Sequence, residues 1–278
     1  MVDARAGSAA GRARRGSGAT SRKGSAGRPI ATGPDGGRAV RPADFLSATA
    51  APVRDHLASS VTLREFVGGD QGTLTLDERR LIVDQALVLL EQNYVHLPLK
   101  VAMHAVNPVQ RLRLLQIRLE RQTAESMDRE IEFHAELSAI FHSVGDLHTN
   151  YLLPAPFKGK VAYLPFLIED YLDADGRRRY VVSHVAQGFS APGFERGVEV
   201  THWSGAPIEA AVDRNAARFA GSNPAARRSR GVQSLTIRPL VIHLPPEEYW
   251  VTVSYLNAQG EAGEVRVEWL VVDNLPLF

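Results

Sequence analysis

The stretch from His142 to Phe157, HSVGDLHTNYLLPAPF, contains the side chains of this sequence best placed to do chemistry. In its middle, His148 stands in a polar setting, GD-HTN, just before an apolar run. An imidazole on such a connection could act as a general base, and Asp146 and Thr149 are near enough in sequence to hold its ring in one tautomer. The residues alone leave the alternative open, which is a structural histidine satisfied by hydrogen bonds.

Other kinds of catalytic site have little support. The nine histidines show no H-x-x-x-H or H-E-x-x-H spacing and there is no cysteine, so we expect neither a metal site nor a thiol nucleophile. No P-loop and no G-x-G-x-x-G occurs, and we expect no cofactor. G-x-S-x-G is also absent, and Ser204 in HWSGAP is better interpreted as a turn residue beside Gly205 than as a nucleophile.

The segments that must position His148 begin with helices. The sequence TLDE at Thr75 to Glu78 is typical of a capping box and predicts a helix to about Asn93. Asn107 followed by Pro108 predicts the start of a second helix. The apolar residues that recur at helical spacing in it are Leu112, Leu115 and Leu119.

A third helix is expected from near Ser126 to Val144, where Gly145 is suited to end it. After His148 the pattern shortens to that of strands, in YLPFLIEDY, RYVVSHV, GVEVTHW, LTIRPLVI, YWVTVSYL and EVRVEWLVV. The last two suit an antiparallel hairpin. Helices followed by strands predict an α+β fold, with an N-terminal helical region and mainly antiparallel β structure after it.

The first 41 residues hold nine Lys or Arg and two Asp or Glu, a charge of +7, which leaves −6 on the rest of a chain whose total is +1. This segment is rich in Gly, Ala, Ser and Pro and predicts a disordered basic tail over residues 1–42. Nucleic-acid binding by the tail is the less favoured interpretation. No apolar run reaches the length of about 18 residues that a membrane helix needs, and no secretory signal follows the N-terminus, so we expect a cytoplasmic protein without a membrane partner.

Two stretches, SVGDLHTNYLLPAPFKGKVAYLPFLIEDY and GVEVTHWSGAPIEAAV, resemble the N-terminal half of the carboxy-terminal-processing, or tail-specific, serine peptidases. The resemblance is greatest to the branch that contains the chlamydial protease-like activity factor. It implies that His148 is the general base. It also implies a helical N-terminal domain over residues 43–150, and a β-rich region over residues 151–278 that contains a PDZ-like module at about 188–245.

In that family the nucleophilic serine belongs to a further C-terminal domain, which we expect to be absent from this chain. The resemblance therefore implies the N-terminal portion of a serine-type endopeptidase, inactive alone, that handles a peptide or protein substrate. Its partner would be a downstream catalytic domain or a second copy of the chain. The alternative is a non-catalytic peptide- or protein-binding module derived from such a peptidase, with His148 structural and the strand around GVEVTHW offering an edge to a peptide.

Overall fold

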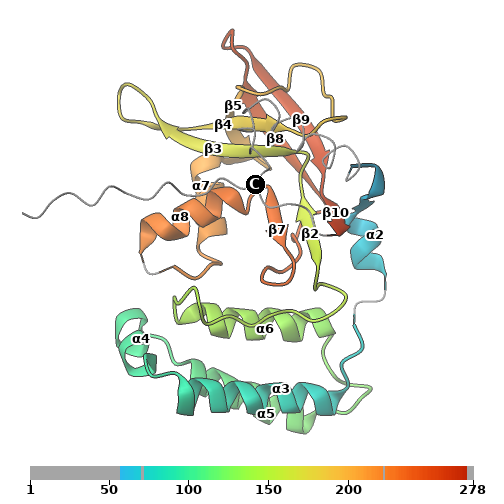
Figure 1. Ribbon diagram of the computed structural model, residues 1–278, viewed down its shortest axis with the longest axis vertical. Helices are drawn as coiled ribbons and strands as arrows, with labels where there is room; N and C mark the ends of the chain where they lie inside the picture. The colour runs from blue at the N-terminus through green and yellow to red at the C-terminus, as the bar shows by residue number, and fades with distance from the viewer. Residues whose placement is uncertain (1–56, 70–71, 222, 274–278) are drawn as a thin grey trace, which may run out of the picture. The chain divides into compact units, whose positions relative to one another are not determined.

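Helices come first along the chain and strands follow, as Figure 1 shows for the computed structural model. The structure describes residues 57–69, 72–221 and 223–273, which all belong to one unit, Pro42–Phe278. The predicted α+β fold is confirmed. The tail predicted for residues 1–42 lies outside the described residues.

The helices before His148 form the first part of the fold. They are α2 (Leu63–Gly68), α3 (Leu76–Leu87), the π-helix η1 (Val88–Asn93), α4 (Leu97–His104), α5 (Pro108–Arg121) and α6 (Glu130–Ser143). Leu112, Leu115 and Leu119 of α5 are at most 1% exposed and pack with apolar residues of α3 and α6, as their helical spacing predicted. None of the helices in the described ranges is long and apolar enough to cross a membrane.

Local side-chain chemistry sets the starts of α3 and α5. The Thr75 hydroxyl accepts from the amide of Glu78, and the Glu78 carboxylate accepts from the amide of Thr75, so the predicted capping box is confirmed. Asn107 caps α5 in the same way by accepting from the amide of Gln110. These contacts satisfy amides that have no partner within the helix.

One helix type and one helix boundary differ from the prediction. The first helix ends at Asn93 as predicted, but it is α-helical only to Leu87 and continues as the π-helix η1. The third helix, α6, begins at Glu130 rather than near Ser126. The reason lies in Ser126, whose hydroxyl accepts from the amide of Thr123 and so closes a turn before the helix instead of starting it.

The strands form two antiparallel sheets. One has the order β1-β10-β2-β7, made of Val61–Thr62, Leu270–Asp273, Lys160–Tyr163 and Ile237–Pro239. The other has the order β3-β4-β5-β8-β9, made of Phe166–Leu172, Arg178–Val185, Glu199–Trp203, Trp250–Leu256 and Ala262–Glu268, with β6 (Ala206–Pro207) paired to β5. Helices α7 (Ile208–Ala216) and α8 (Pro224–Gln233) join β6 to β7. The predicted hairpin is β8–β9, in which Val251 lies opposite Val267.

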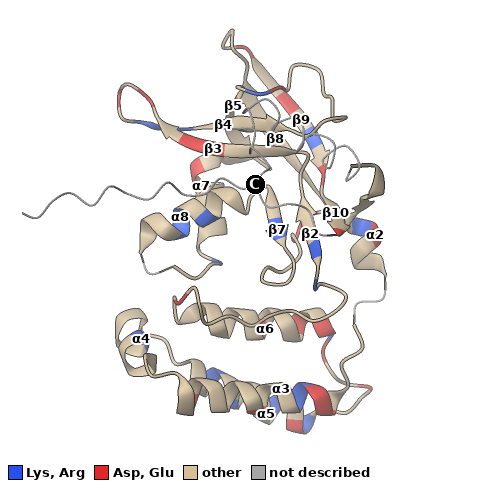
Figure 2. Cartoon of the chain, in the orientation of Figure 1, with Lys and Arg blue, Asp and Glu red and all other residues tan. Residues whose placement is uncertain are grey.

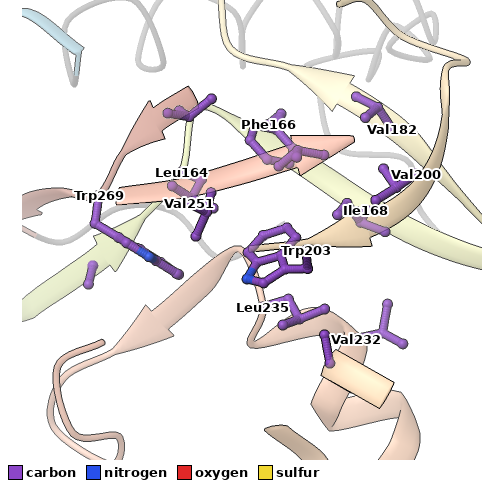
Figure 3. Close-up of a cluster of buried hydrophobic side chains, with 14 of the residues drawn as sticks. Leu164, Phe166, Ile168, Val182, Val200, Trp203, Val232, Leu235, Val251 and Trp269 are labelled. Atoms are coloured by element: carbon purple, nitrogen blue, oxygen red, sulfur yellow. The ribbon is translucent and has the colours of Figure 1, made fainter. Parts of the chain in front are cut away.

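The main core lies on the larger sheet, where alternate residues of each strand point inward. Figure 3 shows the cluster, with Trp203 and Trp269 among aliphatic side chains from several strands. Val182, Val251 and Trp269 are fully buried. Burying side chains of this size contributes roughly 1.5–3 kcal/mol each, so the strands are held mainly by this shared apolar layer.

A buried polar network connects α6 to the chain that follows it. The ring of His134 is 0% exposed and bonds on both sides, with its Nε2 3.1 Å from Glu130 Oε1 and its Nδ1 2.9 Å from the Tyr151 hydroxyl. Glu130 also accepts from the amide of Leu74 at 2.7 Å and lies 3.8 Å from Arg79. Burial lowers the pKa of His134 and raises that of Tyr151, so both side chains are neutral near pH 7. The network thereby fixes Tyr151 against α6.

Replacing His134 by leucine should lower the free energy of unfolding by about 2–4 kcal/mol, because the buried Glu130 carboxylate and the Tyr151 hydroxyl lose their partner. Urea denaturation at pH 7 measures this. The matched control is the exposed histidine, where His148→Ala should change the unfolding free energy by no more than about 0.5 kcal/mol. Equal losses in the two variants would contradict a structural role confined to His134.

Candidate functional site

His148 lies on the short connection between α6 and Tyr151. Helix α6 ends at Ser143, and Gly145 then turns the chain with a φ of 65°. A Cβ on Gly145 would meet Nε2 of His104 at 2.7 Å, so glycine is required both for the backbone angle and for the close approach of α4. The connection that carries His148 is therefore fixed at its start by this turn and at its end by Tyr151.

Asp146 organises the connection between these two points. Its Oδ1 accepts from the backbone amide of His148 at 2.9 Å, and its Oδ2 accepts from the Tyr94 hydroxyl at 2.7 Å. These two hydrogen bonds hold the pKa of Asp146 below its usual value, and the bond from the His148 amide has the larger effect. Burial and the neighbouring carboxylate raise the pKa of Tyr94 to about 12. Asp146 is thus ionised and Tyr94 is a proton donor across the physiological range.

The His148 ring faces solvent, with 96% of its side chain exposed. Its Nδ1 is 3.6 Å from Asp146 Oδ1, a separation that allows ion pairing but exceeds hydrogen-bond length. A small rotation of the ring would let Nδ1–H donate to Asp146 and leave Nε2 as the basic nitrogen. Among the described residues no hydrogen bond joins this ring to a serine hydroxyl. The site thus holds an imidazole beside a carboxylate, with the ring open to solvent.

Ser204, the serine that the sequence placed in a turn, lies between β5 and β6. Both Ser204 and Gly205 have positive φ, 47° and 80°, as a two-residue turn with the twist of a hairpin requires. The Ser204 hydroxyl donates to Glu248 at 3.2 Å. Among the described residues, no group of three His, Cys, Asp or Glu side chains could hold a metal ion.

A groove of about 620 Å³ lies beside β3, between this strand and α7 and α8. It is lined by Asp170 of β3, Asp213 of α7, and Ala225 and Arg228 of α8, among others. Arg228 pairs with Asp213 at 3.0 Å and with Glu209. Within the described ranges β3 pairs with β4 alone, so its other edge has no strand partner.

The strand around GVEVTHW was expected to offer a free edge, and this expectation is wrong. It forms β5, which pairs with β8 on one side and with β4 and the short β6 on the other. Its backbone groups are used within the sheet because β8 returns from far along the chain to lie beside it. Within the described ranges, the strands at the two ends of the larger sheet are β3 and β9, and each has one edge without a strand partner.

A family model for the PDZ domain matches residues 160–275, which include every strand from β2 to β10. The match extends on both sides of the interval 188–245 expected from the sequence. No curated protein sequence matches the chain significantly.

Solved structures share the fold of the described region. Mature CPAF, the chlamydial protease-like activity factor, has a TM-score of 0.56 and 21% identity, covering 73% of this chain and 36% of its own. Mature CPAF complexed with lactacystin has a TM-score of 0.54 and 22% identity, covering 72% of this chain and 36% of its own. The predicted resemblance to the N-terminal part of this peptidase is confirmed at the level of the fold. The match spans 36% of the length of each CPAF structure.

Replacing Tyr94 by phenylalanine should lower the free energy of unfolding by about 1–2 kcal/mol at pH 7, because ionised Asp146 loses a hydrogen-bond donor. Since the fold lowers the pKa of Asp146 from 3.8, this contribution is present above that pH and is lost as the pH falls through the lower value of the folded state.

Urea denaturation of both proteins at several pH values measures the difference. Tyr171→Phe, at a tyrosine that is 46% exposed on β3, is the matched control and should have little effect. A deficit for Tyr94→Phe that stays constant down to the lowest pH would show that the ionised carboxylate is not its cause.

Proposed function

We propose that this chain is the helical and PDZ-domain portion of a serine-type endopeptidase, in which His148 is the general base. The nucleophilic serine would come from a polypeptide segment other than these 278 residues. The observation that carries the proposal is the His148 ring itself, which is 96% exposed beside the ionised carboxylate of Asp146, in a chain with the fold of the N-terminal part of CPAF. A buried structural histidine has the opposite character, as His134 does.

The chemistry expected of this site follows from the two nitrogens of the ring. Asp146 would hold the Nδ1 proton, so that Nε2 takes the proton of the serine hydroxyl as its oxygen attacks the substrate carbonyl. The imidazolium formed would be stabilised by Asp146 and would then give its proton to the leaving amine. Tyr94 would act as a positioning residue, because it holds the other oxygen of Asp146.

The base assignment is tested in a longer chain that joins these residues to the serine-bearing domain. His148→Ala should lower kcat by about four orders of magnitude or more with KM nearly unchanged, because proton transfer to the ring occurs only in the transition state. His184→Ala, at an exposed histidine on β4, is the matched control and should retain full turnover. Undiminished turnover in His148→Ala would refute the assignment.

Labelling the 278-residue chain with a serine-reactive reagent tests whether the nucleophile lies within it. A fluorophosphonate, which labels activated serines covalently, should leave this chain unlabelled, because a base without its nucleophile forms no acyl-enzyme. Mass spectrometry after incubation detects any adduct. A labelled serine within residues 1–278 whose labelling requires His148 would overturn the proposal that the nucleophile lies elsewhere.

A second candidate function is peptide binding without catalysis, which the free edge of β3 favours. An extended peptide could add to β3 by main-chain hydrogen bonds, with side chains in the groove beside α8. The match to a PDZ domain supports this role. It requires no chemistry from His148.

Titration of extended peptides with free C-termini tests this candidate. Ala225→Trp places a bulky ring in the groove at an exposed position and should weaken binding at least about tenfold. Ala102→Trp, at an exposed alanine of α4, is the matched control and should bind like the unmodified chain. If no peptide binds, or if Ala225→Trp binds as well as its control, the groove is not a peptide site.

A further inference from the structure

A second cavity, separate from the groove beside β3, lies between α6 and the segment that follows β7. Its volume is about 810 Å³. Figure 1 shows the chain after β7 descending toward α6, and residues of both elements line the cavity. Its apolar lining includes Ala139 of α6 and Phe219 after α7, with Leu244 and Pro245 from the segment after β7. We call this cavity the α6 cleft. His148 does not line it.

Arg238 of β7 is a buried cation that lines the α6 cleft. The residue is 8% exposed, and among the described residues no carboxylate forms an ion pair with it. Its Nε donates to the carbonyl of Ser234 at 2.9 Å and its Nη2 donates to Asn215 at 3.2 Å, which leaves Nη1 without a partner in the described part of the chain. Figure 2 shows β7 carrying basic charge, in blue. Burial, and then the charge of Arg218, lower the pKa of Arg238 to about 10, although the carboxylates of Glu248 and Glu247 act in the opposite direction.

A histidine and a serine add unused hydrogen-bonding capacity to the same cleft. The Nδ1 of His243 is buried and has no partner among the described residues. Burial, and then Arg238 and His142, lower the pKa of His243 to about 3, so its ring is neutral. The hydroxyl of Ser138, whose residue is 3% exposed, also has no partner in the described ranges. Buried polar groups are normally satisfied, so these point to a ligand.

The carboxylates that line the cleft are already paired. Glu132 accepts from Arg129 at 2.8 Å, and Glu247 accepts from Arg218 at 2.8 Å. Both carboxylates are largely exposed, so they belong to the rim rather than to the interior. Burial also lowers the pKa of His142. The interior of the cleft therefore holds the positive charge of Arg238 and the neutral imidazoles of His142 and His243, beside apolar lining residues.

We propose that the α6 cleft binds a small carboxylate with an apolar body. The carboxylate would accept from Nη1 of Arg238, with Ser138 and His243 as further polar contacts, and the apolar body would lie against Phe219 and Leu244. Arg–carboxylate bonds are among the strongest in proteins because both partners are charged, and a ligand in this position supplies the anion that Arg238 lacks. The site requires no peptidase activity and is distinct from the proposed base at His148.

Isothermal titration of the whole chain with octanoate tests the site. Octanoate should bind saturably, octylamine should not bind because it carries the opposite charge on the same tail, and acetate should bind at least about tenfold more weakly because it lacks the tail. Arg238→Met keeps the apolar stem without the charge and should weaken octanoate binding at least about tenfold.

Because Arg238→Met alters a buried position, a second variant keeps the test decisive. Ala139→Trp fills the cleft from an exposed position of α6 and should weaken octanoate binding at least about tenfold, whereas Ala102→Trp on α4 should leave it unchanged. The proposal is overturned if octanoate gives no saturable heat, if octylamine binds equally well, or if Ala139→Trp binds octanoate as tightly as Ala102→Trp does.

Discussion

The buried bonds from His134 to Glu130 and Tyr151 are the constraint on which the candidate site depends. They join α6 to Tyr151, at the start of the chain that leads into the β region. The connection from the end of α6 to Tyr151, which carries His148, is short. Since Gly145 fixes the other end of this segment against α4, the backbone around His148 has little freedom. A general base must be held within hydrogen-bond reach of its nucleophile. For the proposed role of His148, a rigid backbone around the residue is therefore as important as the imidazole itself. His134 thus supplies the rigidity and His148 the exposed ring.

The same architecture separates three surfaces that could act independently. His148 lies after α6 with Asp146 and Tyr94, the groove beside β3 lies on the PDZ-like side of the fold, and the α6 cleft lies between α6 and the segment after β7. Each has its own charge balance. Asp146 is ionised beside an exposed imidazole, Arg228 is compensated by carboxylates, and Arg238 is buried without one. These differences account for the base, peptide and anion roles proposed for the three surfaces.

Features governed by local chemistry could be predicted from the sequence. The caps at Thr75 and Asn107 and the β8–β9 hairpin depend on residues within a few positions of one another, and all three are confirmed. Features governed by distant contacts could not. The position of β5 inside its sheet depends on β8. Helix α8 contains Gly231 although glycine is a poor helix former. The reason is the close approach of α7, because a Cβ on Gly231 would lie 2.7 Å from the Cβ of Ala216. For His134 a signal existed, because Glu130 precedes it by one helical turn.

The division of roles between His134 and His148 is tested most directly by the rate at which diethyl pyrocarbonate modifies each histidine of the native chain. Mass spectrometry of the digested protein resolves the two residues. His148, with 96% of its side chain exposed, should be modified rapidly in the native chain, and His134, which is 0% exposed, should react only when the protein unfolds. Protection of His148 to the same extent as His134, or equally rapid modification of His134, would contradict the account.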